Sequence, residues 1–287
     1  MRLPDDFYKN VENINYLNHV LYSDTDSVYL KIPHPKEDSL ENKWKRSIEV
    51  SEIINNTIIN YLKDYIFKLA NITPDKNQTF FKTEGLMGGI GFLPDVKKYY
   101  TYQLLVDEGK FLEKPKIKYK NISIKSNLAK MSTDMIQDII NNIILNNNIL
   151  KDQKLNLIHE RINQWGKYYK DLISKYDFSE IGIPNKWSKS TQIINAMKAY
   201  NIIMEKEIFV HGSAGKYIYC NFKMTHPFMM DKSIDIKNLN SLAIPYTYDS
   251  ELLRQKMTKY QIEVDSAKHW DKCIMTTTCQ KLLEMLK

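Results

Sequence analysis

The sequence predicts an α+β fold, in which an antiparallel sheet with a packed helix is followed by a mainly helical part with one small β-hairpin. Runs rich in β-branched and aromatic residues, the composition of half-buried strands, are concentrated in the first 125 residues. After residue 130, apolar residues recur at steps of three and four, which is the period of an amphipathic helix. We therefore expect a sheet first and helices afterwards.

The first predicted element is a hairpin over residues 16–32 that carries two acidic residues at its tip. Its strands are His19–Tyr22 and Val28–Ile32, and the turn between them contains Asp24 and Asp26. Two carboxylates at one tip concentrate negative charge, and such a pair can bind a hard divalent cation such as Mg²⁺. The alternative is an ordinary turn, since Asp, Ser and Thr are common turn residues.

A helix and a second group of strands are predicted next. The helix covers Glu41–Leu69, and its apolar stripe consists of Ile54, Ile58, Leu62, Tyr65, Ile66 and Leu69. Thr79–Lys82 and Tyr99–Val106 have the composition of strands, and Asp107–Lys110 has that of a hairpin turn. Pro115 marks a break after these strands.

The remainder is predicted to be three helices, a hairpin and a last helix. A third helix fits Thr191–Glu205, and a hairpin over Glu207–Phe222 is expected to turn through Gly212–Gly215. Asp265 can cap a final helix that runs to Leu286. The stripes of the first two helices consist of Ile136, Ile139, Ile140, Ile143 and Ile144, and of Leu155, Ile158, Ile162, Trp165, Tyr169, Leu172 and Ile173.

Length and composition limit the kind of protein. The chain has 287 residues, of which 43% are hydrophobic and 26% charged, a balance typical of a soluble globular protein with one large domain or two ordinary ones. No apolar run spans a bilayer and no secretory signal is recognisable, so we expect a cytoplasmic protein without a membrane partner. Cys220, Cys273 and Cys279 form no CxxC pair and are expected to be reduced thiols. The net charge of +7 fits a polyanionic partner.

Two motifs resemble those of one enzyme family. The segment Tyr22–Ser27 reads YSDTDS, and it resembles the C motif of family B DNA polymerases, YGDTDS, with Ser23 in the place of the usual Gly. Downstream, Val96–Tyr102 reads VKKYYTY and resembles the KKRY element of the same family, with Tyr99 where the family has Arg. The order of the two motifs is also that of the family.

Two further stretches extend the resemblance. Lys82–Gly89 is similar to the stretch with a palm glutamate and a glycine-rich bend in replicative polymerases of T-even-like phages, and Lys114–Lys118 resembles the passage from palm to thumb. The resemblance covers nearly the whole chain, although only patterns match in the last two-thirds. It implies that residues 1–118 are the C-terminal part of a palm domain and 119–287 a thumb. A phage origin would place the protein in the host cytoplasm.

The resemblance also implies catalytic roles. Asp26 is the expected principal metal ligand, Asp24 lies beside it, and Glu84 is the expected additional palm carboxylate. The reaction would use two Mg²⁺ ions, with Mn²⁺ as a substitute, to transfer a nucleotide to a primer 3′-hydroxyl. For Glu84, a solvated glutamate at a strand end is the alternative.

Duplex contacts are expected from two basic segments. Lys97, Lys98 and Tyr100 can offer cations to phosphates and a phenol to the sugar or groove edge. The alternative for Lys97 and Lys98 is a solvated charge pair. Further phosphate contacts are expected from Lys116, Lys118 and Lys125 at the entrance to the thumb. The aromatic residues Trp165, Tyr168 and Tyr169 could stack on bases, but helical spacing is more typical of core residues.

Other family motifs have no room before the C motif. The A motif and the fingers lie far upstream in the family, whereas 21 residues precede Tyr22 here. We therefore expect the C-terminal part of a divided DNA-directed DNA polymerase. Its expected partners are primer–template DNA, deoxynucleoside triphosphates and a separate chain with exonuclease, motif A and fingers, and a sliding clamp is a further candidate. The alternatives are a non-catalytic remnant that binds duplex DNA and a DxD glycosyltransferase, which would need a nucleotide-binding region before Asp24.

Overall fold

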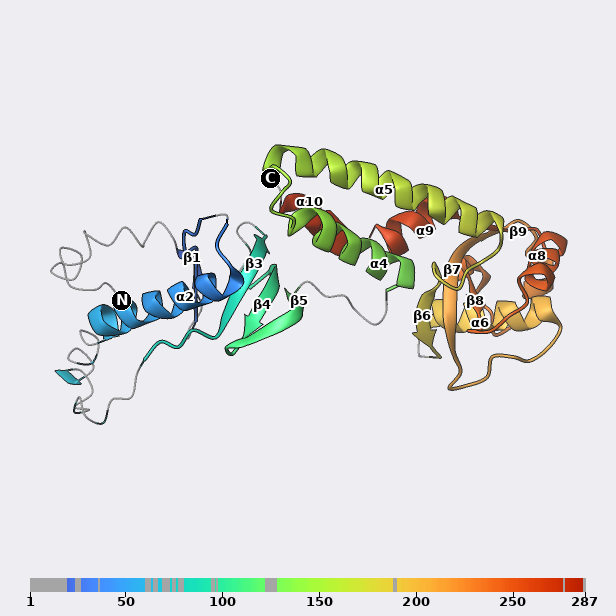
Figure 1. Cartoon of the computed structure of the whole chain (residues 1–287). Coiled ribbons are helices and arrows are strands. Elements are labelled where there is room, and N and C mark those ends of the chain that lie inside the picture. Colours follow the sequence, from blue (N-terminus) through green and yellow to red (C-terminus); the bar gives the residue numbers. More distant parts are fainter. Residues whose placement is uncertain are drawn as a thin grey trace. The chain divides into compact units, whose positions relative to one another are not determined.

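The computed structural model describes residues 20–23, 27–35, 37–59, 63, 67–68, 73, 76, 80–93, 96, 98–121, 128–187, 190–275 and 277–285. They form an α+β fold with antiparallel sheets, as the sequence predicts (Figure 1). The chain divides into two compact units, residues 1–86 with 104–114 and residues 87–103 with 115–287. The division into palm and thumb stays a prediction.

The predicted acidic hairpin is confirmed in its two strands. β1 (Val20–Ser23) and β2 (Val28–Leu30) pair antiparallel, with Ser23 opposite Val28. The predicted helix follows as α2 (Leu40–Ile54), whose first turn is capped by the Ser39 side chain, and it continues as a π-helical turn over Asn55–Ile59. The last four residues of its predicted stripe lie outside the described residues, namely Leu62, Tyr65, Ile66 and Leu69.

Residues 80–84 are irregular, so the prediction of a strand over Thr79–Lys82 is wrong for residues 80–82. The Asn55 side chain forms hydrogen bonds with both backbone polar groups of Phe81, the N–H and the carbonyl oxygen. Its Oδ1 accepts from the Phe81 N–H at 2.6 Å, and its Nδ2 donates to the Phe81 carbonyl oxygen at 2.8 Å. Because a side chain satisfies both groups, they are not available to a strand ladder.

A three-stranded sheet consists of β3 (Gly85–Phe92), β4 (Tyr100–Asp107) and β5 (Lys110–Lys120), in that order. The glycine-rich stretch that was expected to bend is therefore a strand. A Cβ at Gly85 would lie 2.9 Å from both Leu104 Cδ1 and the Val106 carbonyl oxygen, so glycine permits a close approach of β4.

The predicted turn between β4 and β5 is confirmed, and the predicted break at Pro115 coincides with a boundary between the two compact units but not with the end of a strand. Glu108 and Gly109 have φ angles of 48° and 83°, and two consecutive positive φ angles are typical of a two-residue hairpin turn. β5 then continues through Pro115. It is an edge strand of the three-stranded sheet, where a missing N–H is tolerated.

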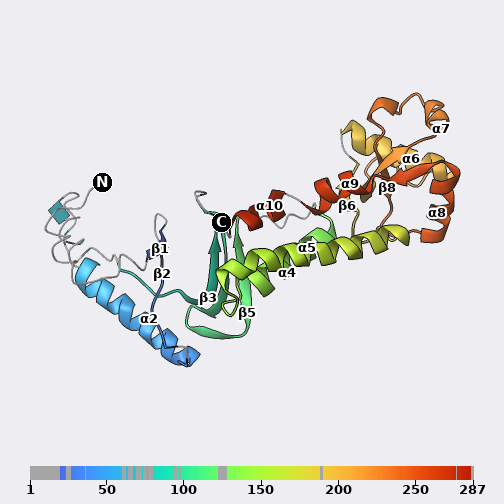
Figure 2. The same ribbon diagram turned by 90° about the horizontal axis from the view of Figure 1, so that it is seen from above.

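The two long helical patterns are confirmed in the second unit. α4 (Lys130–Ile139) continues as a π-helical turn over Ile140–Ile144 and lies alongside α5 (Lys151–Ser174) (Figures 1 and 2). The whole stripe of residues 136–144 is buried, whereas in α5 Leu155 is exposed.

A lobe of antiparallel strands and helices follows α5. Its central strand β7 (Ala214–Phe222) pairs antiparallel with β6 (Ile183–Lys186), β8 (Ser241–Ile244) and β9 (Ile262–Val264). The helices of the lobe are α6 (Thr191–Met204), which confirms the third predicted helix, α7 (His226–Met229), the 3₁₀ turn Ile236–Asn238 and α8 (Ser250–Lys259).

The predicted hairpin over Glu207–Phe222 is wrong in its first arm. Only β7 is a strand, because the Asn201 side chain binds the backbone of the preceding segment. Its Nδ2 donates to the Phe209 carbonyl oxygen at 2.8 Å, and its Oδ1 accepts from the N–H groups of Ile208 and Phe209 at 2.9 and 2.8 Å. A side chain thus takes the place of a neighbouring strand.

The predicted final helix is two helices. Asp265 caps α9 (Ser266–His269) by accepting from the Lys268 N–H, as expected, and α9 continues as a π-helical turn over residues 270–274. The chain leaves helical geometry at Met275, with φ −80° and ψ 65°, before α10 (Thr277–Glu284).

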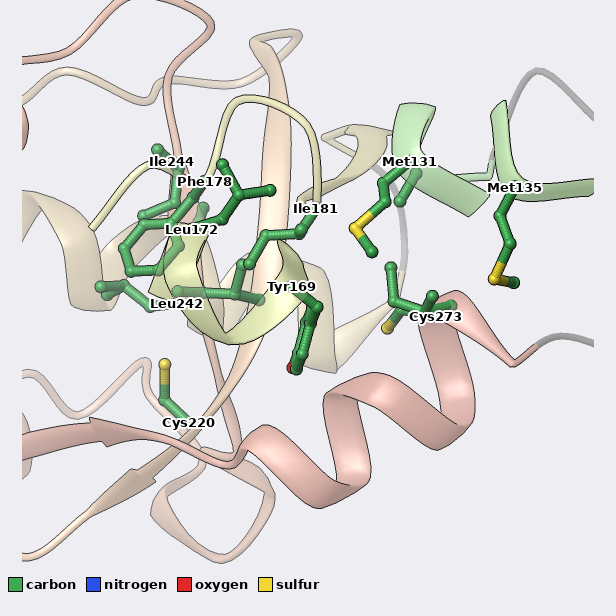
Figure 3. Packing of buried hydrophobic residues seen from close by; sticks show 14 of the residues in the cluster. Met131, Met135, Tyr169, Leu172, Phe178, Ile181, Cys220, Leu242, Ile244 and Cys273 are labelled. Atoms are coloured by element: carbon green, nitrogen blue, oxygen red, sulfur yellow. The ribbon is translucent and has the colours of Figure 1, made fainter. Parts of the chain in front are cut away.

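The core of the second unit joins residues that are distant in the sequence. Figure 3 shows Tyr169, Leu172 and Phe178 near Leu242 and Ile244, with further core residues of α4 and the C-terminal helices. Cys220, Cys273 and Cys279 are all buried, and no disulfide bond joins these described residues. None of the helices in the described part of the chain combines the length and apolar character that crossing a bilayer requires.

Candidate nucleic-acid interface

The predicted acidic tip connects two paired strand ends. Because Ser23 and Val28 are partners in the β1–β2 ladder, residues 24–27 link neighbouring strands. Asp24 and Asp26 lie outside the described residues, so their roles as metal ligands stay predictions. Carboxylate oxygens are the donors that Mg²⁺ takes in phosphate chemistry, and the residue types of the tip fit that ion. Within the described ranges, no cluster of three or more His, Cys, Asp or Glu residues could hold a metal.

Glu84 immediately precedes strand β3 and is exposed. Its carbonyl oxygen accepts from the Glu108 N–H at 2.6 Å, which holds the backbone of Glu84 against the β4–β5 turn. Both residues belong to the first compact unit, as do β1 and β2. The geometry leaves the Glu84 carboxylate accessible, and its catalytic role stays a prediction.

The start of β4 has an unusual backbone. Lys98 has a φ of 62°, in the left-handed region that non-glycine residues rarely adopt, and its carbonyl oxygen accepts from Asn121 Nδ2 at 2.9 Å. Lys97 lies outside the described residues. Tyr100 is buried, with its ring centroid 5.6 Å from that of Phe92 and 6.0 Å from that of Tyr102. A duplex contact by Tyr100 stays a prediction, and its observed neighbours are aromatic rings.

Strand β5 carries alternating lysines. Ile117 and Tyr119 pack against the buried core, and burial raises the pKa of Tyr119. Since successive strand residues point to opposite faces, Lys116, Lys118 and Lys120 share the other face, about 6.7 Å apart along the strand. This set of three is called the β5 lysine face.

The lysines of the β5 face are available to an external anion. No carboxylate of a described residue lies within 4.0 Å of any of them. The strand is held from behind, because Thr101 Oγ1 donates to the Lys118 carbonyl oxygen at 3.1 Å. A row of cations without acidic partners suits the phosphates of a nucleic acid. Lys125, predicted to extend this row, lies outside the described residues.

The sequence did not indicate that the C-terminal helix reaches this region. Lys281 of α10 places its Nζ 4.6 Å from the centroid of the Tyr99 ring. These two residues are 182 positions apart, and no spacing in the sequence links them. The burial of Cys279 and Leu282 in α10 is the amphipathic pattern that could have suggested a packed helix.

The aromatic residues of α5 hold the fold. Tyr169 is buried and stacks on His269, and its hydroxyl donates to the Ser266 carbonyl oxygen at 3.0 Å, which confirms a core role. Trp165 Nε1 donates to Asp138 Oδ2 at 2.9 Å. The Tyr168 hydroxyl donates to Glu180 Oε2 at 2.8 Å, although its ring is partly open to solvent.

A polar network ties α4 to α5 through Asp138. Arg161 Nη1 lies 2.8 and 2.9 Å from the two Asp138 oxygens, and Asn142 Nδ2 donates at 2.7 Å. Burial opposes ionisation of this carboxyl, but the hydrogen bonds from Trp165, Asn142 and Arg161 outweigh it and lower the pKa of Asp138. The network is a structural clamp, since its acceptor is already occupied.

No protein-family model and no curated protein matches this chain.

Proposed function

We propose that this chain is the C-terminal palm and thumb part of a divided DNA-directed DNA polymerase of the family B type. The observation that carries the proposal is the segment Tyr22–Ser27, which resembles the C motif of that family and is flanked by the paired strands β1 and β2. In this proposal, residues 1–118 belong to the palm and residues 119–287 to the thumb.

Several features support the proposal in the order in which they occur along the chain. The acidic hairpin is followed by the exposed Glu84, then by Lys98, two residues before β4, and then by the β5 lysine face. Phosphate contacts of this kind position a duplex without reading its sequence, as a replicative polymerase requires. The net charge of +7 agrees with such a ligand.

Each residue of the proposed site has a distinct role. The carboxylates of Asp26 and Asp24 would hold Mg²⁺, or Mn²⁺ as a substitute, with Glu84 as an additional carboxylate nearby. When bound, two metal ions activate the primer 3′-hydroxyl and neutralise charge on the departing pyrophosphate. Lys98, Lys116 and Lys118 would neutralise primer–template phosphates, and Lys97, Lys125 and the Tyr100 phenol would add contacts.

A partner chain completes the enzyme in this proposal. It would supply exonuclease, motif A and the fingers that grip the incoming deoxynucleoside triphosphate. A sliding clamp would be a further partner.

Metal-dependent primer extension tests the proposal. The chain would be assayed alone, then mixed with the protein encoded immediately upstream of its gene, with that protein alone as the control. We expect synthesis only in the mixture, and only with Mg²⁺ or Mn²⁺. Equal synthesis by the upstream protein alone would contradict the proposal, because this chain would then add nothing to catalysis.

The second candidate is a non-catalytic protein that binds duplex DNA. The β5 lysine face is the observation that favours it, since phosphate binding needs no acidic hairpin. It predicts duplex binding without synthesis in any mixture, and binding that is unchanged by Asp26→Asn.

A further inference from the structure

Helix α10 brings a lysine onto the start of strand β4. Cys279 and Leu282 are buried, which anchors α10 and fixes the position of the half-buried Lys281 between them in the chain. Lys281 Nζ lies 4.6 Å from the centroid of Tyr99, a residue that is 7% exposed. The buried Tyr99 ring is therefore held in place, and the long side chain of Lys281 lies over it.

The Lys281 ammonium has N–H donors that no described carboxylate occupies. No carboxylate of a described residue lies within 4.0 Å of Lys281. A cation over an aromatic face is attracted by the ring quadrupole, by about 0.5–1 kcal/mol at an exposed site. This attraction holds the ammonium in place but accepts no classical hydrogen bond, so its three N–H groups remain available to an anion.

The surrounding backbone is also held. Lys98 precedes Tyr99 in the chain, and its left-handed conformation is supported by the hydrogen bond from Asn121. Lys281 thus adds a cation to a segment that already contains Lys98. Because residue 99 is a tyrosine, its own side chain provides no cation at this position, and Lys281 places one above its ring.

We propose that Lys281, positioned by the Tyr99 ring, contacts a phosphate of duplex DNA. The inference depends on the proposed function, because that function identifies the ligand as a duplex. It adds α10, at the far end of the sequence, to the surface that holds the primer–template. Tyr99 is a positioning residue in this arrangement, and Lys281 is the contact.

The test is the salt dependence of binding to a fluorescently labelled primer–template duplex, measured by anisotropy with the full chain. Each phosphate contact contributes about 0.9 to the slope of log K against log salt. We expect Lys281→Gln to lower the slope by about that amount, and Lys281→Arg to restore it. Lys237→Gln, which removes one exposed lysine from another part of the same unit, should leave the slope unchanged.

The pairing with Tyr99 has its own readout. If the ring positions the ammonium, Tyr99→Leu lowers the slope, and the double variant with Lys281→Gln loses no more than Lys281→Gln alone. A lower unfolding temperature of Lys281→Gln with an unchanged slope would overturn the inference, since Lys281 would then be only structural. An unchanged slope in Lys281→Gln beside a lowered slope in Lys116→Gln/Lys118→Gln would overturn it and leave the proposed function standing. Absence of duplex binding by the wild-type chain would overturn both.

Discussion

His269 is a buried imidazole that stacks on Tyr169 and lies edge-on to Tyr219. Its Nδ1 accepts from the Tyr219 N–H at 3.3 Å, and its Nε2 lies 2.9 Å from the Ile181 carbonyl oxygen. Nε2 therefore carries the proton of a neutral ring, because a carbonyl can only accept. Burial lowers the pKa of His269 to about 4. Through these contacts His269 links its own helix, α9, to strand β7 and to the loop that follows α5. It has no role in the proposed chemistry.

This low pKa predicts an acid-sensitive fold. The folded-state pKa is below the unfolded value of about 6.5, so the stabilisation is complete above pH 6.5 and is lost as the pH falls towards 4. The loss is about 2–3 kcal/mol across that range. Urea unfolding between pH 7.5 and pH 4.5 should show a steep decline in the wild type and a shallower one in His269→Gln. The exposed His159→Gln is the control, and equal slopes in all three proteins would contradict this role of His269.

The lysines of the β5 lysine face lie on one side of the strand because successive strand residues point to opposite faces. Substituting two of them should therefore have an additive effect on DNA binding. The double variant Lys116→Gln/Lys118→Gln should lower the salt slope of duplex binding by about 1.8, twice the contribution of one phosphate contact. The matched control Lys232→Gln/Lys237→Gln removes the same charge from exposed positions elsewhere in the second unit. Equal losses in the two double variants, measured by anisotropy, would mean that net charge rather than the β5 lysine face attracts DNA.

Two glycines of the second unit should respond oppositely to the same substitution. Gly166 lies inside α5, where a Cβ would meet Trp270 at 3.7 Å, an ordinary contact, so Gly166→Ala should stabilise by about 0.5–1 kcal/mol. Gly212 has a φ of 90°, so Gly212→Ala should destabilise by about 1 kcal/mol even though its Cβ would meet nothing within 4 Å. Urea midpoints measure both, and a shift in the same direction would refute the backbone argument.

Elements with a strong local period could be predicted from the sequence, and those fixed by distant side chains could not. The isoleucine stripe of residues 136–144 is buried as predicted, because its period alone selects the inward face. By contrast, Asn55 and Asn201 bind backbone that would otherwise have fitted a strand, and nothing local identifies those partners. The short strand β8 is buried along its whole length, so it lacks the alternation that indicates a strand.

The same limit applies to the candidate site. The lysines of β5 could be predicted because they lie within one segment, whereas the approach of Lys281 to Tyr99 depends on how α10 packs. Glu84 was expected near the end of a strand over Thr79–Lys82, whereas it immediately precedes β3, in a stretch that was expected to bend. Asp24, Asp26, Lys97 and Lys125 keep the roles that the resemblance implies.

For the whole molecule, the proposed function gives the two compact units different roles, carboxylate chemistry in the first and phosphate binding in the second. The paired strands around the acidic tip and Glu84 belong to the first unit, and Lys98, the β5 lysine face and α10 belong to the second. The proposed carboxylate chemistry and the proposed phosphate binding can therefore be impaired separately. Substitutions in the β5 lysine face should weaken DNA binding at high salt, whereas substitutions at the acidic tip should leave binding intact and abolish synthesis.

The most direct test of the central claim is single-nucleotide incorporation by the reconstituted mixture, measured for Asp26→Asn. The loss of a metal ligand should lower the rate by about 10³-fold or more, since several kcal/mol of transition-state stabilisation depend on the metal. Asp24→Asn should lose less, and Asp152→Asn, at an exposed position of α5, should match the wild type. Duplex binding should be equal in all four proteins. Wild-type incorporation by Asp26→Asn would contradict the claim that this chain carries a catalytic carboxylate of a divided polymerase.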